Sequence, residues 1–170
     1  GEGDGGDGGT GAGGLTREDV QKIIQDWADL YPSAYGDSFD NVETQSTTWV
    51  ALEPPVSVTF TVPPSRRLVA TTCMTARNMQ TLAQTYQSLR ITTANGSVLV
   101  DASDSRAVTV SSDNIDEASS ACYTYRLDLA SLGGGAVQPG EEITVTVMNR
   151  TETGTATVLD RNVTLDSAIG

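Results

Sequence analysis

Histidine is absent from this 170-residue sequence, and lysine occurs only once, at Lys22. The absence of histidine removes the commonest general base, the histidine-containing catalytic triads and the commonest metal ligand. The sequence therefore predicts a protein that is not an enzyme and needs no cofactor. Asp113, Asp116 and Glu117 form an acidic cluster of the oxygen type that calcium prefers. Because their spacing matches no EF-hand loop, we expect a solvated loop there and no metal site.

Positive charge is also scarce. The 10 basic side chains are outnumbered by 22 acidic ones, which leaves a formal net charge of -12. Phosphate backbones and anionic lipids would be repelled, so we expect no binding to nucleic acid. No apolar run approaches the roughly 20 residues of a membrane span, no signal segment opens the chain, and we expect no membrane insertion. Because the chain starts with Gly1 rather than Met, we expect a fragment or a processed product.

Cysteine occurs twice, at Cys73 and Cys122, and both residues lie in strand-like runs. One interpretation makes them small buried hydrophobic side chains. In the other they form a disulfide, which would close a loop of about 50 residues and contribute on the order of 4 kcal/mol to stability. Both interpretations stay open, and two thiols without histidine make a poor zinc site.

Residues 1–14 contain nine glycines and no apolar side chain larger than Ala12, so this segment cannot form a core. It is either a flexible linker or the last turns of a collagen-like stem. The stem is favoured by a strict three-residue period, which a triple helix requires because only glycine fits at its axis. The glycines that keep this period are Gly5, Gly8, Gly11 and Gly14.

Residues 15–31 have the pattern of an amphipathic helix. Thr16 is a suitable N-cap, Asp19 lies where a capping box needs it, and Pro32 prevents the helix from continuing. Apolar residues recur at spacings of three and four. These residues are Val20, Ile23, Ile24, Trp27, Leu30 and Tyr31.

This apolar stripe must be buried, because a lone helix of about 15 residues is marginal in water. Two ways to bury it remain open. The stripe is either the seam of a short coiled coil between copies of the chain, or it packs against the chain's own β-rich remainder. If the glycine-rich segment is a collagen-like stem, three chains arrive at the helix together and the seam is that of a homotrimer. The residues expected to form this seam are Val20, Ile23, Ile24, Trp27 and Leu30.

The segment 32–48 is polar, and we expect a loop that carries Tyr35 and Phe39. From Trp49 onward the period changes to two, and short strand-like runs follow one another with turn signals between them. The hairpin signal at Asn95-Gly96 is the strongest of these. The runs are 47–52, 56–62, 67–78, 86–93, 97–103, 107–112, 122–129, 143–150, 155–160 and 162–166. This pattern predicts an all-β domain at 49–170, an antiparallel β-sandwich of jelly-roll-like type.

The order of these runs resembles the C-terminal β-sandwich of minor tail and fibre proteins of tailed bacteriophages that infect actinobacteria. Arg66 departs from that family's pattern, because glycine is usual there after the Pro-Pro-Ser turn. The residues that carry the resemblance are Leu15-Thr16-Arg17-Glu18-Asp19-Val20, Val62-Pro63-Pro64-Ser65, Asp104-Ser105-Arg106, Thr144-Val145-Thr146-Val147-Met148-Asn149-Arg150, Gly154-Thr155-Ala156-Thr157 and Asp160-Arg161.

The resemblance implies a non-enzymatic structural protein of the phage particle. Its implied form is a trimer through stem and helix, with partners among other virion proteins and a host cell-wall glycan or surface receptor, and its implied place is the tail. One alternative is a capsid decoration or head-fibre protein. Another is a carbohydrate-binding module tethered to an enzyme, which would stack sugar rings on exposed aromatic side chains. The candidates for that role are Trp49, Tyr86, Tyr123 and Tyr125.

Overall fold

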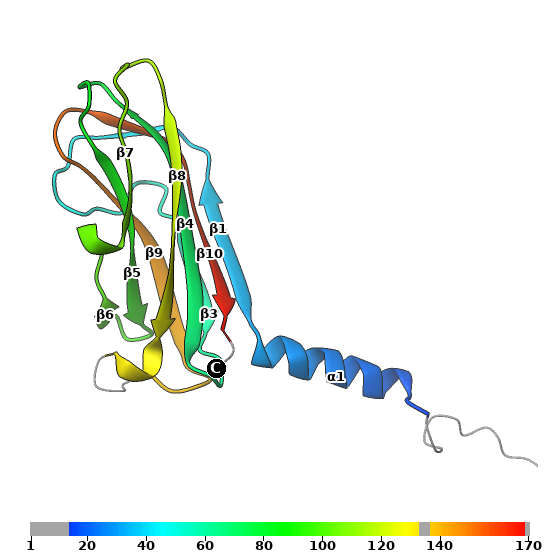
Figure 1. Ribbon diagram of the computed structural model, residues 1–170. Helices are drawn as coiled ribbons and strands as arrows, with labels where there is room; N and C mark the ends of the chain where they lie inside the picture. Colours follow the sequence, from blue (N-terminus) through cyan, green and yellow to red (C-terminus); the bar gives the residue numbers. More distant parts are fainter. Residues whose placement is uncertain (1–13, 133–136, 169–170) are drawn as a thin grey trace, which may run out of the picture.

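The computed structural model describes residues 14–132 and 137–168, so the segment predicted as a stem or linker lies outside the described residues except for Gly14. Within them the chain forms an N-terminal helix and ten strands (Figure 1). The elements are α1 Arg17–Leu30, β1 Ser33–Ser38, β2 Val42–Thr44, β3 Ser57–Thr61, β4 Arg67–Asn78, β5 Thr85–Thr93, β6 Val98–Val100, η2 Asp104–Arg106, β7 Ala107–Val110, β8 Ser119–Asp128, η3 Leu129–Ser131, β9 Glu142–Thr151 and β10 Ala156–Ser167.

The strands form two five-stranded sheets that pack face to face. The first sheet has the order β1-β10-β4-β8, with β2 also paired to β10, and the second has the order β3-β9-β5-β6, with β7 also paired to β5. All pairings between the named strands are antiparallel. The prediction of an antiparallel β-sandwich is therefore confirmed.

The core fills the space between the sheets, and its residues come from the alternating runs. In and around β3, Val56, Phe60 and Val62 are buried and Val58 is half-buried against the same core, while the serine and threonine residues between them face outward. In β9, Ile143, Val145 and Val147 are buried in the same way. The alternation read from the sequence thus identifies the inner face of both strands.

Two strands lie in the segment 32–48, where a loop was expected, so that prediction is wrong. β1 and β2 both pair with β10 at one edge of the first sheet. Their composition gives no strand signal, because the only residues buried in them, Ser38 and Thr44, are polar, and the pairing with β10 specifies both strands. Gly36 fits this packing, since a Cβ there would lie 2.7 Å from Val58 Cγ1. The sandwich consequently begins at Ser33, before the predicted boundary at 49.

The run 47–52 is not a strand, contrary to expectation. It pairs with β9 only through an isolated bridge between Val50 and Asn149. Arg161, which is buried, donates hydrogen bonds from Nη2 to the carbonyl oxygens of Leu52 and Pro54. Burial lowers the pKa of this guanidinium. The segment is therefore shaped by contacts with the core and has no ladder of its own.

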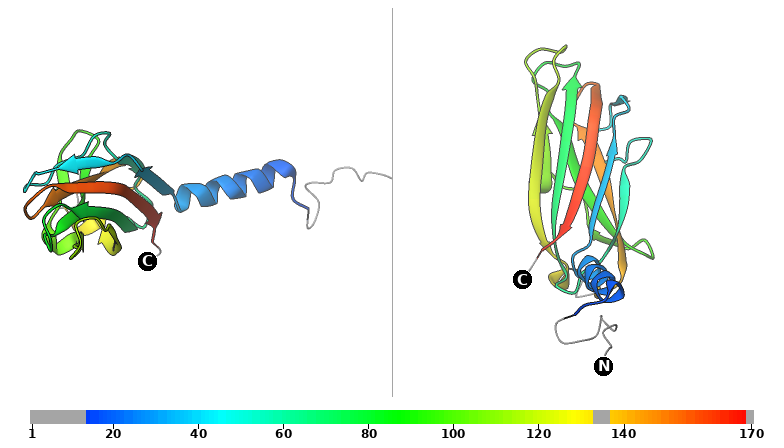
Figure 2. Two further views of the ribbon diagram at one scale, coloured as in Figure 1. Left: turned by 90° about the horizontal axis from the view of Figure 1, so that it is seen from above. Right: turned by 90° about the vertical axis from the view of Figure 1, so that its right-hand side faces the viewer.

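The sandwich has two ends with different contents, which we call the base and the tip (Figure 1). The base carries the start of β1, the turn at 63–66, the β5–β6 hairpin and the turn at 138–141. The tip consists of three connecting loops, at 79–84, 111–118 and 152–155. Helix α1 leaves from the base and extends away from both sheets (Figure 2).

Cys73 and Cys122 lie opposite each other on β4 and β8 and form a disulfide. The bond lies on the outer face of the first sheet, because the neighbouring positions Thr72 and Met74 point into the core. Cys122 is exposed, so the interpretation of two buried hydrophobic side chains is wrong for it.

Candidate interaction surface on the N-terminal helix

The helix forms where its local signals place it. Thr16 Oγ1 accepts a hydrogen bond from the Asp19 backbone N–H at 3.1 Å, and Asp19 Oδ2 accepts one from the Thr16 backbone N–H at 3.0 Å. This reciprocal pair is the predicted capping box, which satisfies two backbone donors that a helix start leaves unpaired. The helix ends at Leu30, two residues before Pro32. The predicted helix is therefore confirmed at both ends.

The apolar stripe of α1 is exposed along its whole length. Ile24 keeps 62% of its surface accessible and Trp27 keeps 59%, and the other members are also exposed, namely Val20, Ile23, Leu30 and Tyr31. Among the described residues, no strand packs along the helix (Figures 1 and 2). The expectation that the stripe packs on the chain's own sandwich is therefore wrong. The residues proposed as an oligomer seam all lie on one uncovered surface.

The spacing of the stripe suits contact with other helices. Val20 and Trp27 are seven residues apart, and so are Ile23 and Leu30, as the a and d positions of a heptad require. Ile24 and Tyr31 widen the stripe by a third row. The rings of Trp27 and Tyr31 lie 4.9 Å apart between centroids, which makes them one aromatic surface near the end of the helix.

The other face of α1 is polar and faces solvent. Lys22 Nζ lies 3.0 Å from Asp26 Oδ2, and both side chains are largely exposed. Such an exposed pair four residues apart contributes only about 0.3–0.5 kcal/mol. The polar face therefore adds solubility and little stability, and the apolar face remains without a described partner.

Two hollows lie at the base. The one beside the helix, of about 420 Å³, is lined by Ala28 and Pro32 and, across from them, by Pro64 and Pro139. The other, of about 700 Å³, lies between the β5–β6 hairpin and the turn at 140–142. The larger hollow is lined by the carboxylates of Glu141 and Glu142 and by the polar side chains of Thr93, Asn95 and Ser97. In the described residues no group of three or more histidine, cysteine, aspartate or glutamate side chains could hold a metal ion.

The four aromatic candidates for sugar stacking do not form an exposed platform. Tyr125 is buried, and Tyr123 is half-buried beside it with ring centroids 5.4 Å apart. Trp49 and Tyr86 are half-buried on the outer side of the second sheet and meet edge to face. A tethered carbohydrate-binding module therefore lacks the surface that it needs at these positions.

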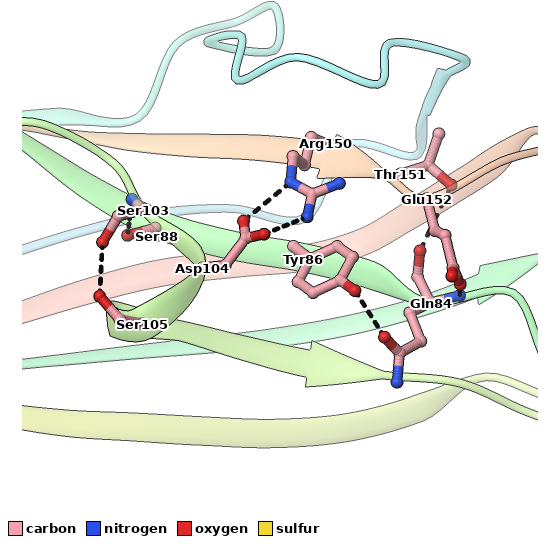
Figure 3. A network of polar contacts seen from close by, with 9 residues as sticks. All are labelled: Gln84, Tyr86, Ser88, Ser103, Asp104, Ser105, Arg150, Thr151 and Glu152. Atoms are coloured by element: carbon pink, nitrogen blue, oxygen red, sulfur yellow. Dashed lines mark hydrogen bonds and ion pairs between the residues drawn. The ribbon is translucent and has the colours of Figure 1, made fainter.

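Arg150 holds the Trp49–Tyr86 pair in place. Its guanidinium carbon lies 3.9 Å from the centroid of the Tyr86 ring and 5.4 Å from that of Trp49. It also donates two hydrogen bonds to Asp104, from Nε at 3.0 Å and from Nη2 at 2.6 Å (Figure 3). These bonds raise the pKa of the Arg150 guanidinium. The sequence offered no signal for this cluster, because its members come from four separate segments.

The acidic loop at 111–118 lies at the tip, with Asp113, Asp116 and Glu117 all exposed. Two side-chain oxygens beside these carboxylates accept hydrogen bonds from the backbone of the same loop. Ser112 Oγ accepts from the Asn114 N–H at 3.1 Å, and Asn114 Oδ1 accepts from the Asp116 N–H at 3.0 Å. The loop is thus shaped by its own hydrogen bonds.

Comparison with known proteins identifies the architecture. No protein-family model and no curated protein sequence matches the chain. Among solved structures, the VP2 subviral particle of infectious bursal disease virus is 10% identical with a TM-score of 0.51, over 82% of this chain and 33% of that one. The T13 particle of the same virus is 9% identical with a TM-score of 0.47, over 81% of this chain and 31% of that one.

A further match is the Eiger TNF of S. frugiperda, which is 12% identical with a TM-score of 0.47 and covers 82% of this chain and 94% of that one. The chain spans about a third of the length of the virus proteins that it matches. At such identities the likeness concerns the fold alone, and the match to VP2 agrees with the β-sandwich described above. In the described residues no helix is long and apolar enough to cross a membrane.

Proposed function

We propose that this chain is a non-enzymatic structural component of a virus particle, a trimeric minor-tail or fibre module that assembles through α1 and displays its sandwiches outward. The observation that carries the proposal is the uncovered apolar stripe of α1, which extends away from a sandwich whose own core is complete. An exposed apolar face of this size is rarely left in water by a single chain. The ordered motifs shared with phage tail proteins support the virion role, and the sandwich is of a kind that a virus-particle protein also uses.

Three copies suit this helix better than two. The stripe has three rows, Val20 with Trp27, Ile23 with Leu30, and Ile24 with Tyr31. A stripe wider than the a and d rows favours bundles larger than a dimer, and isoleucine at a d position, as at Ile23, shifts the preference in the same direction. The glycine-rich segment before the helix fits the same number if it is a triple-helical stem.

The test is the mass in solution of the whole chain, measured by sedimentation equilibrium at micromolar concentration. We expect three times the chain mass of 17.8 kDa for the parent, and a folded monomer for the variant Ile23→Asp with Trp27→Asp. The matched control is Gln21→Asp with Gln25→Asp, which adds the same charge on the opposite face and should remain trimeric. A monomeric parent, or a variant that keeps the parent's mass, would contradict the trimer.

The position on the particle is a separate part of the proposal. The tail is favoured by the resemblance to minor tail proteins, and the rival is a capsid decoration or head-fibre protein with the same sandwich. Gold-labelled antibody against the chain, applied to intact particles, should mark the tail. Labelling confined to the head would move the module there without affecting the assembly through α1.

A further inference from the structure

The tip carries exposed apolar side chains at the end of the sandwich opposite α1. Among the described residues from Ser33 onward, six large hydrophobic side chains are exposed, and three of them lie in the tip, namely Met79, Leu82 and Ile115. The others are Tyr35 and Phe39, in and directly after β1, and Val98 at the base. The tip therefore gathers three exposed aliphatic side chains on neighbouring loops.

Leu82 is held in a backbone conformation that leucine rarely adopts. Its φ is +64°, in the left-handed region, and 64% of its surface is exposed. A side chain other than glycine costs roughly 1–2 kcal/mol in this region. Because the Leu82 side chain is exposed, its burial contributes little free energy to offset this backbone cost. Packing within the chain therefore does not explain leucine at this position. Strain of this kind is typical of functional positions.

Hydrogen bonds between the three loops fix the tip before any partner arrives. The Leu82 N–H donates to the Ser112 carbonyl at 2.9 Å and so ties the loop of Leu82 to the loop of Ile115. The Met79 N–H donates to the Thr155 carbonyl at 2.9 Å, and the Glu152 N–H donates to the Gln84 carbonyl at 2.8 Å. The side chain of Glu152 accepts in return from the Gln84 N–H at 3.1 Å (Figure 3).

Close packing adds to these bonds. A Cβ at Gly154 would lie 2.7 Å from Asn78 Oδ1, and Asn78 Nδ2 donates to the Thr153 carbonyl at 3.0 Å. The loop at 152–155 is thus seated against the end of β4. A surface ordered in advance loses less conformational entropy when it binds, so its apolar contacts translate more fully into affinity.

The charge of the tip is uniformly negative. Its three loops contain no lysine or arginine, and they carry four acidic side chains, Asp113, Asp116, Glu117 and Glu152, all of them exposed. Anionic lipid and nucleic acid would be repelled by these carboxylates, three of which lie on the loop at 111–118 and one on the loop at 152–155. A partner surface with aliphatic side chains among lysines or arginines is complementary to the tip, because its apolar groups match the exposed apolar side chains and its positive charges match the carboxylates.

We propose that the tip is a docking surface for a protein segment that carries aliphatic side chains among lysine or arginine residues. Met79, Leu82 and Ile115 supply its apolar contacts, and the four carboxylates supply its negative charge. This inference adds a binding site to the proposed function. It rests on that function only in one point, namely that assembly through α1 leaves the tips of the sandwiches free to bind a partner.

The test uses the full chain with ¹³C-labelled methionine, leucine and isoleucine methyl groups. The probe is a 14-residue peptide of leucine and lysine, and the matched peptide contains leucine and glutamate. We expect the lysine peptide to shift the methyl resonances of Met79, Leu82 and Ile115, and the glutamate peptide to leave them unchanged. Absence of binding by the lysine peptide would overturn the proposal. Shifts confined to α1 methyl groups such as those of Ile24 and Leu30 would also overturn it.

The variant Met79→Gln with Leu82→Asn removes two of these apolar contacts. It should fold at least as stably as the parent, because asparagine tolerates a positive φ better than leucine does. We expect its peptide affinity to fall by about tenfold or more, while Val98→Thr at the base leaves the affinity unchanged. Unshifted core methyl groups of Ile91 and Ile143 verify the fold, and an unchanged affinity in the double variant would refute the site. Sedimentation of the same samples reports the trimer independently, so failure of one proposal is distinguishable from failure of the other.

Discussion

Arg150 connects three segments of the chain through one side chain. Only 15% of its side-chain surface is exposed, whereas 61% of that of its ion-pair partner Asp104 is exposed. An ion pair with one exposed member contributes little, about 0–1 kcal/mol, because water screens it. Burial of the arginine stem and the contact of its guanidinium with the Tyr86 ring are less screened, and a desolvated contact of this kind is worth up to about 2 kcal/mol.

The stacked guanidinium of Arg150 and its ion pair with Asp104 should therefore contribute unequally to the free energy of unfolding. We expect Arg150→Ala to lower the free energy of unfolding by about 1–3 kcal/mol, and Asp104→Ala to lower it by less than about 1 kcal/mol. Urea denaturation of both variants at pH 7 measures the difference. Equal losses that disappear in 1 M salt would mean that the ion pair, and not the stacked guanidinium, is the main contribution.

Among the elements, the turn between β3 and β4 holds Arg66 in a backbone conformation that favours glycine. Arg66 follows Pro63-Pro64-Ser65, and its N–H donates to the Pro63 carbonyl at 2.9 Å to close the turn. Its φ is +54°, in the left-handed region that favours glycine. Arginine at this position therefore carries a backbone cost that glycine would avoid.

Replacing Arg66 with glycine should stabilise the protein. The substitution relieves a left-handed cost of about 1–2 kcal/mol and adds a chain-entropy cost of about 0.5–1 kcal/mol. We expect a net gain of roughly 0.5–1 kcal/mol in the free energy of unfolding, measured by urea denaturation. The control is Arg67→Gly in β4, where extended backbone gives glycine no advantage and stability should fall. A loss of stability in Arg66→Gly would show that the arginine side chain makes contacts worth more than the strain.

At the scale of the whole molecule, α1 and the sandwich should unfold separately. The helix shares no packed face with the strands in the described part of the chain, so its stability depends on other copies and hence on concentration. The sandwich has its own core and depends on itself alone. The chain offers a direct probe of each part, because Trp27 lies on the helix and Trp49 on the sandwich.

Fluorescence of two single-tryptophan variants separates the transitions. In Trp49→Phe, the thermal midpoint reported by Trp27 should rise with protein concentration. In Trp27→Phe, the midpoint reported by Trp49 should stay constant over the same range. One shared midpoint at every concentration would mean that the helix and the sandwich form a single cooperative unit.

Elements whose signals are local could be recognised from the residues alone. The capping box of Thr16 and Asp19, the stop at Pro32 and the alternation from Val56 onward all act within a few residues, so α1 and the strands β3 to β9 were predicted. The runs 155–160 and 162–166 were predicted as two strands, whereas they form the single strand β10. The hairpin at Asn95-Gly96 belongs with them, since Gly96 adopts the positive φ of +90° that its turn needs.

Features that depend on residues far apart in the chain could be recognised only from the paired and packed strands. β1 and β2 are strands because β10 pairs with them across more than 110 positions of sequence, and their own polar residues carry no such pattern. The exposure of the α1 stripe and the gathering of Met79, Leu82 and Ile115 at the tip follow from how the sheets stack. Sequence periodicity reports which face of an element is apolar, whereas packing determines whether that face is covered, and by what.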